Sequence, residues 1–241
     1  MGVFPSKEDA DRTNAKKFLT RALITIVVVF ITSKWFSDFI PFTVYEFWES
    51  KGTGYEWFIT SLPLFVWVIS VTFIIEMFFT KTNEGGRQNA KIDILLNGFR
   101  ISLLAGVFEE IYFRWLVFFS AIAFVKVLNF LFFGFLGFGV LEWFHMTILG
   151  PIANFFTLGI LKDFLFHPAG WMVGAAMLSA NASFRNEHKY LGPMGFVNSW
   201  FIGMFFFYLM FTYGLIASIV VHFLYDMLFF ITVYLVAVIK R

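Results

Sequence analysis

The stretch LLAGVFEEIYFRWLVFF, residues 103–119, decides the fold because it sets three ionisable side chains inside an apolar run. Glu109, Glu110 and Arg114 are costly in lipid unless they face a protein interior or a water-filled cavity. On a helix, Glu110 and Arg114 are four residues apart and share a face, so we predict that they form an ion pair. Glu109 points about 100° away and is left for a second partner. A carboxylate placed in that way is a candidate general base, and the structural alternative is an ion-pair cluster that only locks helix packing.

The composition around this stretch is that of a polytopic helical membrane protein. Of the 241 residues, 59% are hydrophobic and 14% are charged, too little polar surface for a soluble domain of this size. We therefore expect an all-α transmembrane bundle. Apolar windows of about 20 residues predict about eight spans, of which the fifth and sixth are short and could be re-entrant or tilted: 18–34, 57–79, 94–114, 117–141, 147–161, 168–184, 197–213 and 214–239.

The placement of basic residues predicts the orientation of the chain. Lysine and arginine gather in the tail 1–17, in the 80–92 and 185–193 loops and at Lys240-Arg241, whereas the 35–56 loop carries three glutamates. Cytoplasmic loops carry the excess of lysine and arginine. We therefore expect an integral membrane protein with both termini in the cytoplasm. The chain has no cysteine, which excludes disulfides and a thiol nucleophile.

Two further pairs of residues have helical spacing. His222 and Asp226, in IVVHFLYDMLFF, are four residues apart within the last apolar run, and a purely structural His–Asp pair is an equal alternative for them. Phe184 and His188, in SFRNEHKY, have the same spacing at the end of a weak span. Taken alone, His188 would be read as a loop histidine.

A competing pair lies on another membrane segment. Glu142 and His145 are three residues apart in LEWFHMTILG, a spacing that carboxylate–histidine metal sites use in helix bundles. A zinc ion held by Glu109, His145 and His222 is therefore an alternative. The ligand spacing matches no standard metal motif, and we expect no metal and no cofactor. His167 precedes a proline and is interpreted as a loop residue.

The ordered motifs EExxxR, FxxxH and HxxxN or HxxxD resemble those of the CAAX prenyl protease 2 (type II CAAX endopeptidase) and bacterial Abi family of intramembrane proteases. Here they read Glu109-Glu110 with Arg114, then Phe184 with His188, then His222 with Asp226. The segment GMFFFYLMFTYGLIASIVVHFLYD also resembles the closing helix pair of that family. The resemblance covers roughly residues 95–230.

The resemblance implies a metal-independent peptidase of the membrane. It implies that Glu109 and His188 activate water, that His222 and Asp226 stabilise the oxyanion, and that Glu110 and Arg114 support the site. Charge placement and apolar windows predict a cytoplasmic tail at 1–17 and N-terminal membrane spans at 18–93. The resemblance implies that 94–239 is a catalytic core with an inserted helical hairpin near 120–165. The expected partners are the lipid bilayer and a membrane-bound or lipidated peptide, and no nucleic acid.

Two departures from the family pattern affect these assignments. About 70 residues separate the first two motifs, more than the family leads us to expect, so His145 is an alternative second-motif histidine. We favour His188, because Phe184 matches the motif and Leu141 does not. Position 226 is Asp where some members have Asn, and an ionised Asp226 would repel an oxyanion. It must be protonated, or it must orient His222 as the donor.

We also expect a difference in depth that the motifs do not explain. His188 is assigned to the cytoplasmic end of a span, whereas Glu109 is assigned to a deep position in the third span. A cytoplasm-facing cavity would bring the two residues together. The alternative from a different functional class is a non-catalytic membrane scaffold, immunity or maturation partner that keeps the polar cluster for packing. Whether a histidine approaches Glu109 separates the two readings.

Overall fold

The structure is a computed structural model that describes residues 20, 23–31, 33–34, 41–79, 87–167 and 170–240, with the backbone alone for 87–93. The predicted tail at 1–17 and part of the predicted first span lie outside these residues. The chain divides into two compact units. Unit 1 is Met1–Val44 with Trp115–Ala180, and unit 2 is Tyr45–Arg114 with Asn181–Arg241.

All regular structure among the described residues is helical, as the composition predicts. Residues 23–31 are helical, and the later elements include α-helices, three π-helices (η3, η4 and η6) and three 3₁₀ turns (η2, η5 and η7). Their bounds are η2 Glu46–Trp48, α2 Gly54–Ile74, η3 Ile75–Phe79, α3 Arg87–Glu109, η4 Glu110–Val117, α4 Phe118–Leu131, η5 Gly134–Leu136, α5 Val140–Phe144, η6 His145–Leu149, α6 Gly150–Phe156, α7 Lys162–Leu165, α8 Met172–Glu187, η7 Lys189–Leu191, α9 Gly192–Tyr213 and α10 Leu215–Ile239.

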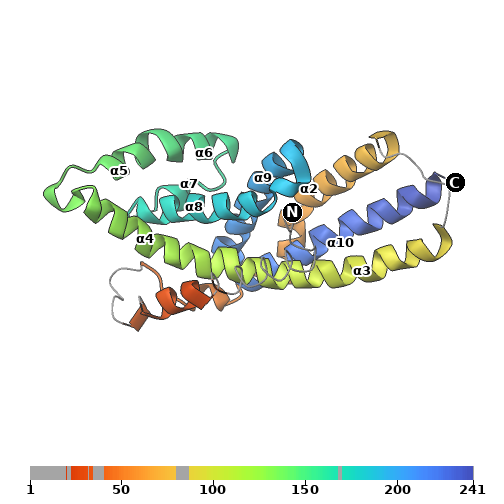
Figure 1. Cartoon of the computed structure of the whole chain (residues 1–241), viewed down its shortest axis with the longest axis horizontal. Coiled ribbons are helices and arrows are strands. Elements are labelled where there is room, and N and C mark those ends of the chain that lie inside the picture. Colours follow the sequence, from red (N-terminus) through yellow and green to blue (C-terminus); the bar gives the residue numbers. More distant parts are fainter. Residues whose placement is uncertain are drawn as a thin grey trace, which may run out of the picture. The chain divides into compact units, whose positions relative to one another are not determined.

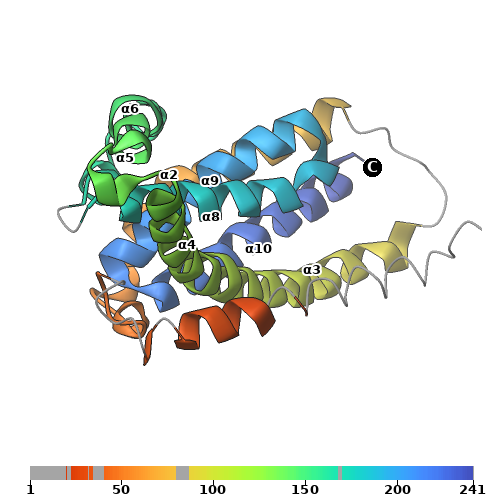
Figure 2. The same ribbon diagram turned by 60° about the vertical axis from the view of Figure 1, so that its left-hand side comes forward.

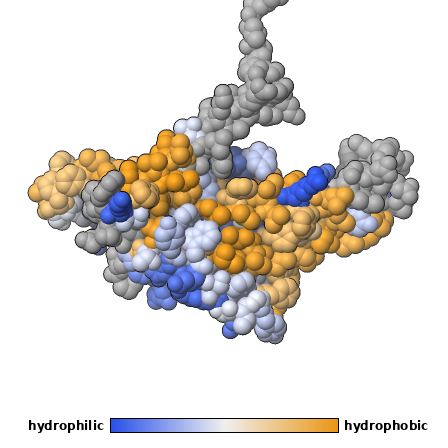
Figure 3. Space-filling model, turned by 90° about the horizontal axis from the view of Figure 1, so that it is seen from below, coloured by the Kyte–Doolittle hydropathy of each residue, from blue (hydrophilic) through white to orange (hydrophobic). Residues whose placement is uncertain are grey.

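Four helices of the described chain are long and apolar enough to cross a membrane: Gly54–Phe79, Ile94–Leu131, Lys189–Tyr213 and Leu215–Ile239. The predicted third and fourth spans are one continuous helix of 38 residues, and Figure 2 shows the ribbon passing from α3 into α4 without a break. Its length of about 57 Å is nearly twice the hydrocarbon thickness of a bilayer. The number of eight spans is not confirmed. Orange apolar surface covers long stretches of the face drawn in Figure 3.

Unit 2 is built around α10, which packs against α2, α3 and α9. In Figure 1, α10 runs between α2 and α3. Two glycines of α3 permit the close approach to α10: a Cβ at Gly106 would lie 3.1 Å from the carbonyl oxygen of Ile219, and one at Gly98 would lie 2.6 Å from the ring of Phe230. Small residues at helix contacts let backbones approach one another closely in membrane bundles. Because Gly106 lies three residues before Glu109, this contact sets the EExxxR motif against α10.

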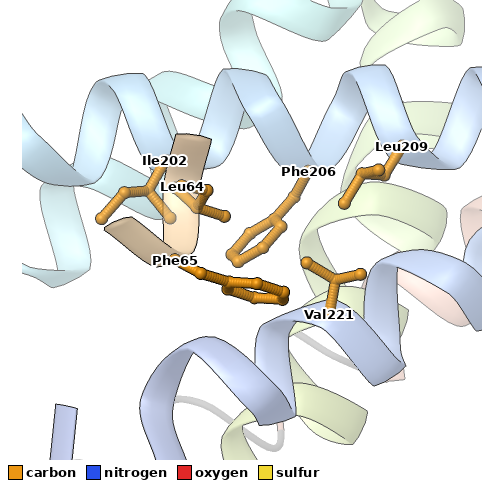
Figure 4. Packing of buried hydrophobic residues seen from close by; sticks show 6 residues of the cluster. All are labelled: Leu64, Phe65, Ile202, Phe206, Leu209 and Val221. Atoms are coloured by element: carbon orange, nitrogen blue, oxygen red, sulfur yellow. The ribbon is translucent and has the colours of Figure 1, made fainter. Parts of the chain in front are cut away.

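An apolar cluster joins three helices of unit 2. Leu64 and Phe65 of α2, three side chains of α9 and Val221 of α10 interdigitate in Figure 4. The α9 members are Ile202, Phe206 and Leu209. Helices α9 and α10 are joined by a tight reversal at Gly214, whose φ of 96° favours glycine. The cluster and the reversal together fix the face of α10 that carries His222.

Unit 1 contains the segments of the predicted insertion near 120–165. Helix α4 packs its buried Phe118, Phe119 and Ile122 inward. Between α4 and α5, the chain turns through Phe133, which has a left-handed φ of 57°. From Val140 the chain is helical again through α5, η6 and α6. Short connections on either side of α7 lead to α8, the helix that carries Phe184 and ends one residue before His188.

Candidate functional site

The EExxxR motif lies where the longest helix changes its hydrogen-bond pattern. Glu109 is the last residue of α3, and Glu110 begins the π-helix η4, which also contains Arg114. A π-helix bonds each residue to the one five positions away, and such segments are rare and often occur at functional sites. The motif is therefore held in an unusual backbone within an otherwise regular helix.

Glu110 and Arg114 form the predicted ion pair. Arg114 Nη1 lies 3.1 Å from Glu110 Oε1, and both side chains are fully buried. The guanidinium lies over the ring of Phe184 at 4.0 Å and over that of Phe206 at 5.3 Å, close enough for cation–π attraction. Its Nη2 donates to the carbonyl oxygen of Gly203 at 3.5 Å. The buried charge of Arg114 is thus matched by a carboxylate, two aromatic faces and a backbone oxygen.

The carboxylate of Glu110 has two further donors, both on α10. His222 Nδ1 lies 2.8 Å from Oε1, and the hydroxyl of Ser218 lies 2.5 Å from Oε2. An ionised carboxylate only accepts hydrogen bonds, so Nδ1 of His222 carries a proton. With Arg114, these contacts involve both oxygens of Glu110, whose side chain is fully buried.

His222 is oriented by contacts on its face and on its edges. Its ring stacks on Phe206 with centroids 4.4 Å apart and an interplanar angle of 24°. Because Nδ1 is bound to Glu110, Nε2 is the edge that points away from it. Nε2 lies 3.7 Å from Oδ2 of Asp226. The predicted pair of His222 and Asp226 therefore exists, with the carboxylate on the opposite edge of the imidazole from Glu110.

His188 approaches Glu109, as the family resemblance leads us to expect. Nε2 of His188 lies 3.8 Å from Oε2 of Glu109, whose side chain is 30% exposed. Nδ1 of His188 donates to the carbonyl oxygen of Phe184 at 2.8 Å, and the two rings lie 4.5 Å apart. The FxxxH motif is thus one local unit in which Phe184 anchors His188. The expected difference in depth between Glu109 and His188 is absent.

His145 has different surroundings, in unit 1. It is buried, and Nε2 donates to the carbonyl oxygen of Leu165 at 3.0 Å. The rings of Phe166 and Trp171 lie beside it, and burial lowers the pKa of the imidazole below its ordinary value. Its predicted partner Glu142 is exposed. Within the described part of the chain, no three His, Cys, Asp or Glu side chains cluster as metal ligands would, so the zinc alternative gains no support.

Ser218 is a site residue that the motifs did not predict. It lies four residues before His222 and eight before Asp226, so all three occupy one face of α10. That spacing is a signal that would have found it. Gly203 and Phe206 of α9 carry no such signal, because they contribute a backbone oxygen and an apolar ring.

The site contains two facing pairs of polar side chains, each made of one carboxylate and one imidazole. Glu109 faces His188 and Asp226 faces His222, each across 3.7–3.8 Å. These separations exceed a direct hydrogen bond, and they leave room for a water only where it approaches both groups from the side. A carboxylate and an imidazole on either side of one water can move a proton. Comparisons with protein-family models, with curated proteins and with solved structures found no match.

Proposed function

We propose that this protein is a metal-independent intramembrane endopeptidase of the CAAX protease-like and Abi type. The observation that carries the proposal is the approach of His188 to Glu109, together with the electrostatic interaction of both side chains with Asp226, the neighbour of His222. Peptide hydrolysis needs a base for water and a donor for the developing oxyanion. The two pairs supply groups of these two kinds.

In the proposed reaction, Glu109 and His188 bind water between them. Glu109 takes one proton as the water oxygen bonds to the carbonyl carbon of the peptide. The oxyanion accepts a hydrogen bond from His222, which Asp226 helps to keep protonated. Collapse of the intermediate breaks the C–N bond, and the proton held by Glu109 passes to the leaving amine. Glu110 and Arg114 hold the site and take no part in proton transfer.

The substrate class follows from the setting of the site. Glu109 and Asp226 lie on helices that are long and apolar enough to cross a membrane, so a membrane-bound peptide, with or without a lipid group, is the substrate we propose. We also propose that both termini are cytoplasmic. Ser6→Cys in the N-terminal tail should then react with an impermeant maleimide only from the cytoplasmic side, and Lys51→Cys only from the opposite side. The chain has no cysteine of its own, so each label reports one position.

Cleavage by the purified protein in liposomes tests the activity. The substrates are a panel of membrane peptides with and without a farnesyl group. We expect cleavage that chelators leave intact and that Glu109→Gln lowers by at least about 100-fold. The matched control is Glu142→Gln, which changes an exposed carboxylate in unit 1 and should cleave as the wild type does. Wild-type cleavage by Glu109→Gln would overturn the mechanism, and inhibition by chelators would favour a metal site. A wild-type protein that cleaves no peptide favours the scaffold.

A further inference from the structure

Ser218 is a fully buried hydroxyl that the proposed mechanism does not use. It lies on α10 one turn before His222, and its Oγ is 2.5 Å from Oε2 of Glu110. The carbonyl oxygen of Phe206 lies 3.2 Å from the same hydroxyl. A serine has one proton to donate, so it can fully satisfy only one of these two acceptors.

The charge of Arg114 decides where that proton goes. Glu110 is ion-paired with Arg114 in a fully buried setting, so its carboxylate is ionised and accepts hydrogen bonds only. Hydrogen bonds to ionised groups are shorter and stronger than those between neutral groups. The Ser218 proton therefore points to Glu110, and the shorter of its two distances agrees with this. Oε2 is bound by Ser218 while Oε1 is bound by Arg114 and His222.

We propose that Ser218 is a positioning residue that fixes the tautomer of His222. With Oε2 tied to Ser218, the carboxylate cannot turn about its last torsion, and Oε1 stays on Nδ1 of His222. The imidazole then keeps its proton on Nδ1 and presents Nε2 to Asp226. The tautomer of His222 does not depend on the proposed function. Only the position of Nε2 toward a substrate, and the expected change in kcat, rest on it.

The fixed tautomer has a chemical consequence for the proposed reaction. In a neutral imidazole with the proton on Nδ1, Nε2 is an acceptor. His222 can therefore donate to an oxyanion through Nε2 only as the imidazolium. That cation would have a carboxylate at each edge, Glu110 at 2.8 Å and Asp226 at 3.7 Å. An aspartate at position 226 suits this arrangement, because its charge favours the second proton.

The tautomer is measured by nitrogen-15 spectra of the full chain with labelled histidine in lipid nanodiscs. The chain has four histidines, so His222→Gln assigns the signals. We expect Nδ1 of His222 to be protonated in the wild type. In Ser218→Ala, the proton should be shared between the two nitrogens, and kcat should fall about tenfold with KM unchanged. Ser218→Cys retains a weak donor, so we expect intermediate values for both.

Ser199→Ala is the matched control. Ser199 is a buried serine on α9 whose hydroxyl donates to the backbone oxygen of Gly195, so its loss should change neither the His222 signals nor kcat. A wild type whose His222 carries a proton on Nε2 and none on Nδ1 would overturn the proposal without any variant. Wild-type signals in Ser218→Ala would do the same. The spectra need no activity, so the tautomer result stands or falls apart from the peptidase.

Discussion

His145 in unit 1 and His222 in unit 2 are both buried histidines, and they differ in what surrounds the ring. His145 has a backbone oxygen at one nitrogen and aromatic rings beside it. His222 has a carboxylate at each edge and a ring beneath it. A buried imidazole among neutral groups is stable only when uncharged, whereas one between carboxylates can take up and release a proton. Burial and residue type alone therefore do not identify a catalytic histidine.

The largest expected difference between the two histidines is in activity. His222→Ala should lower kcat by about 100-fold or more, because the oxyanion loses its donor. His145→Ala should leave the peptide-cleavage rate unchanged and lower only the thermal stability. Both variants are measured in the liposome assay. Loss of cleavage in His145→Ala together with normal cleavage in His188→Ala would reverse the choice of second-motif histidine.

The second-largest expected effect is on stability, and it comes from removing a charge from the surroundings of His222. Arg114→Met leaves Glu110 buried without its cation, and removal of one partner of a buried ion pair costs about 3–5 kcal/mol. The free energy of unfolding in detergent measures the loss. Arg100→Met, which changes an exposed arginine of the same helix, should cost far less. An equal loss in the two variants would mean that the buried pair contributes little.

Replacing a glycine by alanine tests the packing around each of the two histidine environments, because Gly174 lies beside His145 and Gly203 lies beside Arg114. A Cβ at Gly174 would meet the backbone oxygen of Leu165 and lie 2.8 Å from Nε2 of His145. A Cβ at Gly203 would meet the side-chain oxygen of Asn181 and lie 3.2 Å from Arg114 Nη2. Overpacking costs about 1–3 kcal/mol, and backbone yields less than a side chain does.

We therefore expect Gly174→Ala to lower the unfolding free energy more than Gly203→Ala. The control is Gly54→Ala at the start of α2, where a Cβ would meet nothing within 4 Å. A smaller loss in Gly174→Ala than in Gly203→Ala would mean that the helix carrying Gly174 can shift.

The smallest effect is the pH dependence of stability that His145 contributes. Its pKa is lowered by burial from the ordinary 6.5, so below pH 6.5 the unfolded chain binds more protons than the folded one. The stability that His145 contributes therefore rises with pH below 6.5. It is fully present above pH 6.5 and is lost as the pH falls. The slope is at most about 1.4 kcal/mol per pH unit. His145→Gln should remove this part of the slope in denaturation series between pH 5 and 7.5, and an unchanged slope would contradict a neutral His145.

The pairs within one helix could be predicted, because helical spacing alone places Glu110 on Arg114 and His222 on Asp226. The contact between Glu110 and His222 could not, since it depends on how closely α3 approaches α10 at Gly98 and Gly106. The helix around the motif could be predicted, but its continuity could not. The charges at 109–114 lower the local hydropathy and suggested two spans where one helix runs through.

The π-helix at Glu110–Val117 has a consequence for the face each side chain occupies. A turn with bonds to the fifth residue takes one residue more than an α-turn. The apolar stripe that precedes the motif therefore resumes out of phase after it, and one 3.6-residue period cannot describe both halves. Deleting one residue from this segment would restore the phase and rotate the part of the helix that follows the deletion relative to Glu109. The π-helix therefore helps to determine the directions of the motif side chains. Helical spacing before Glu110 and after Val117 has to be counted separately.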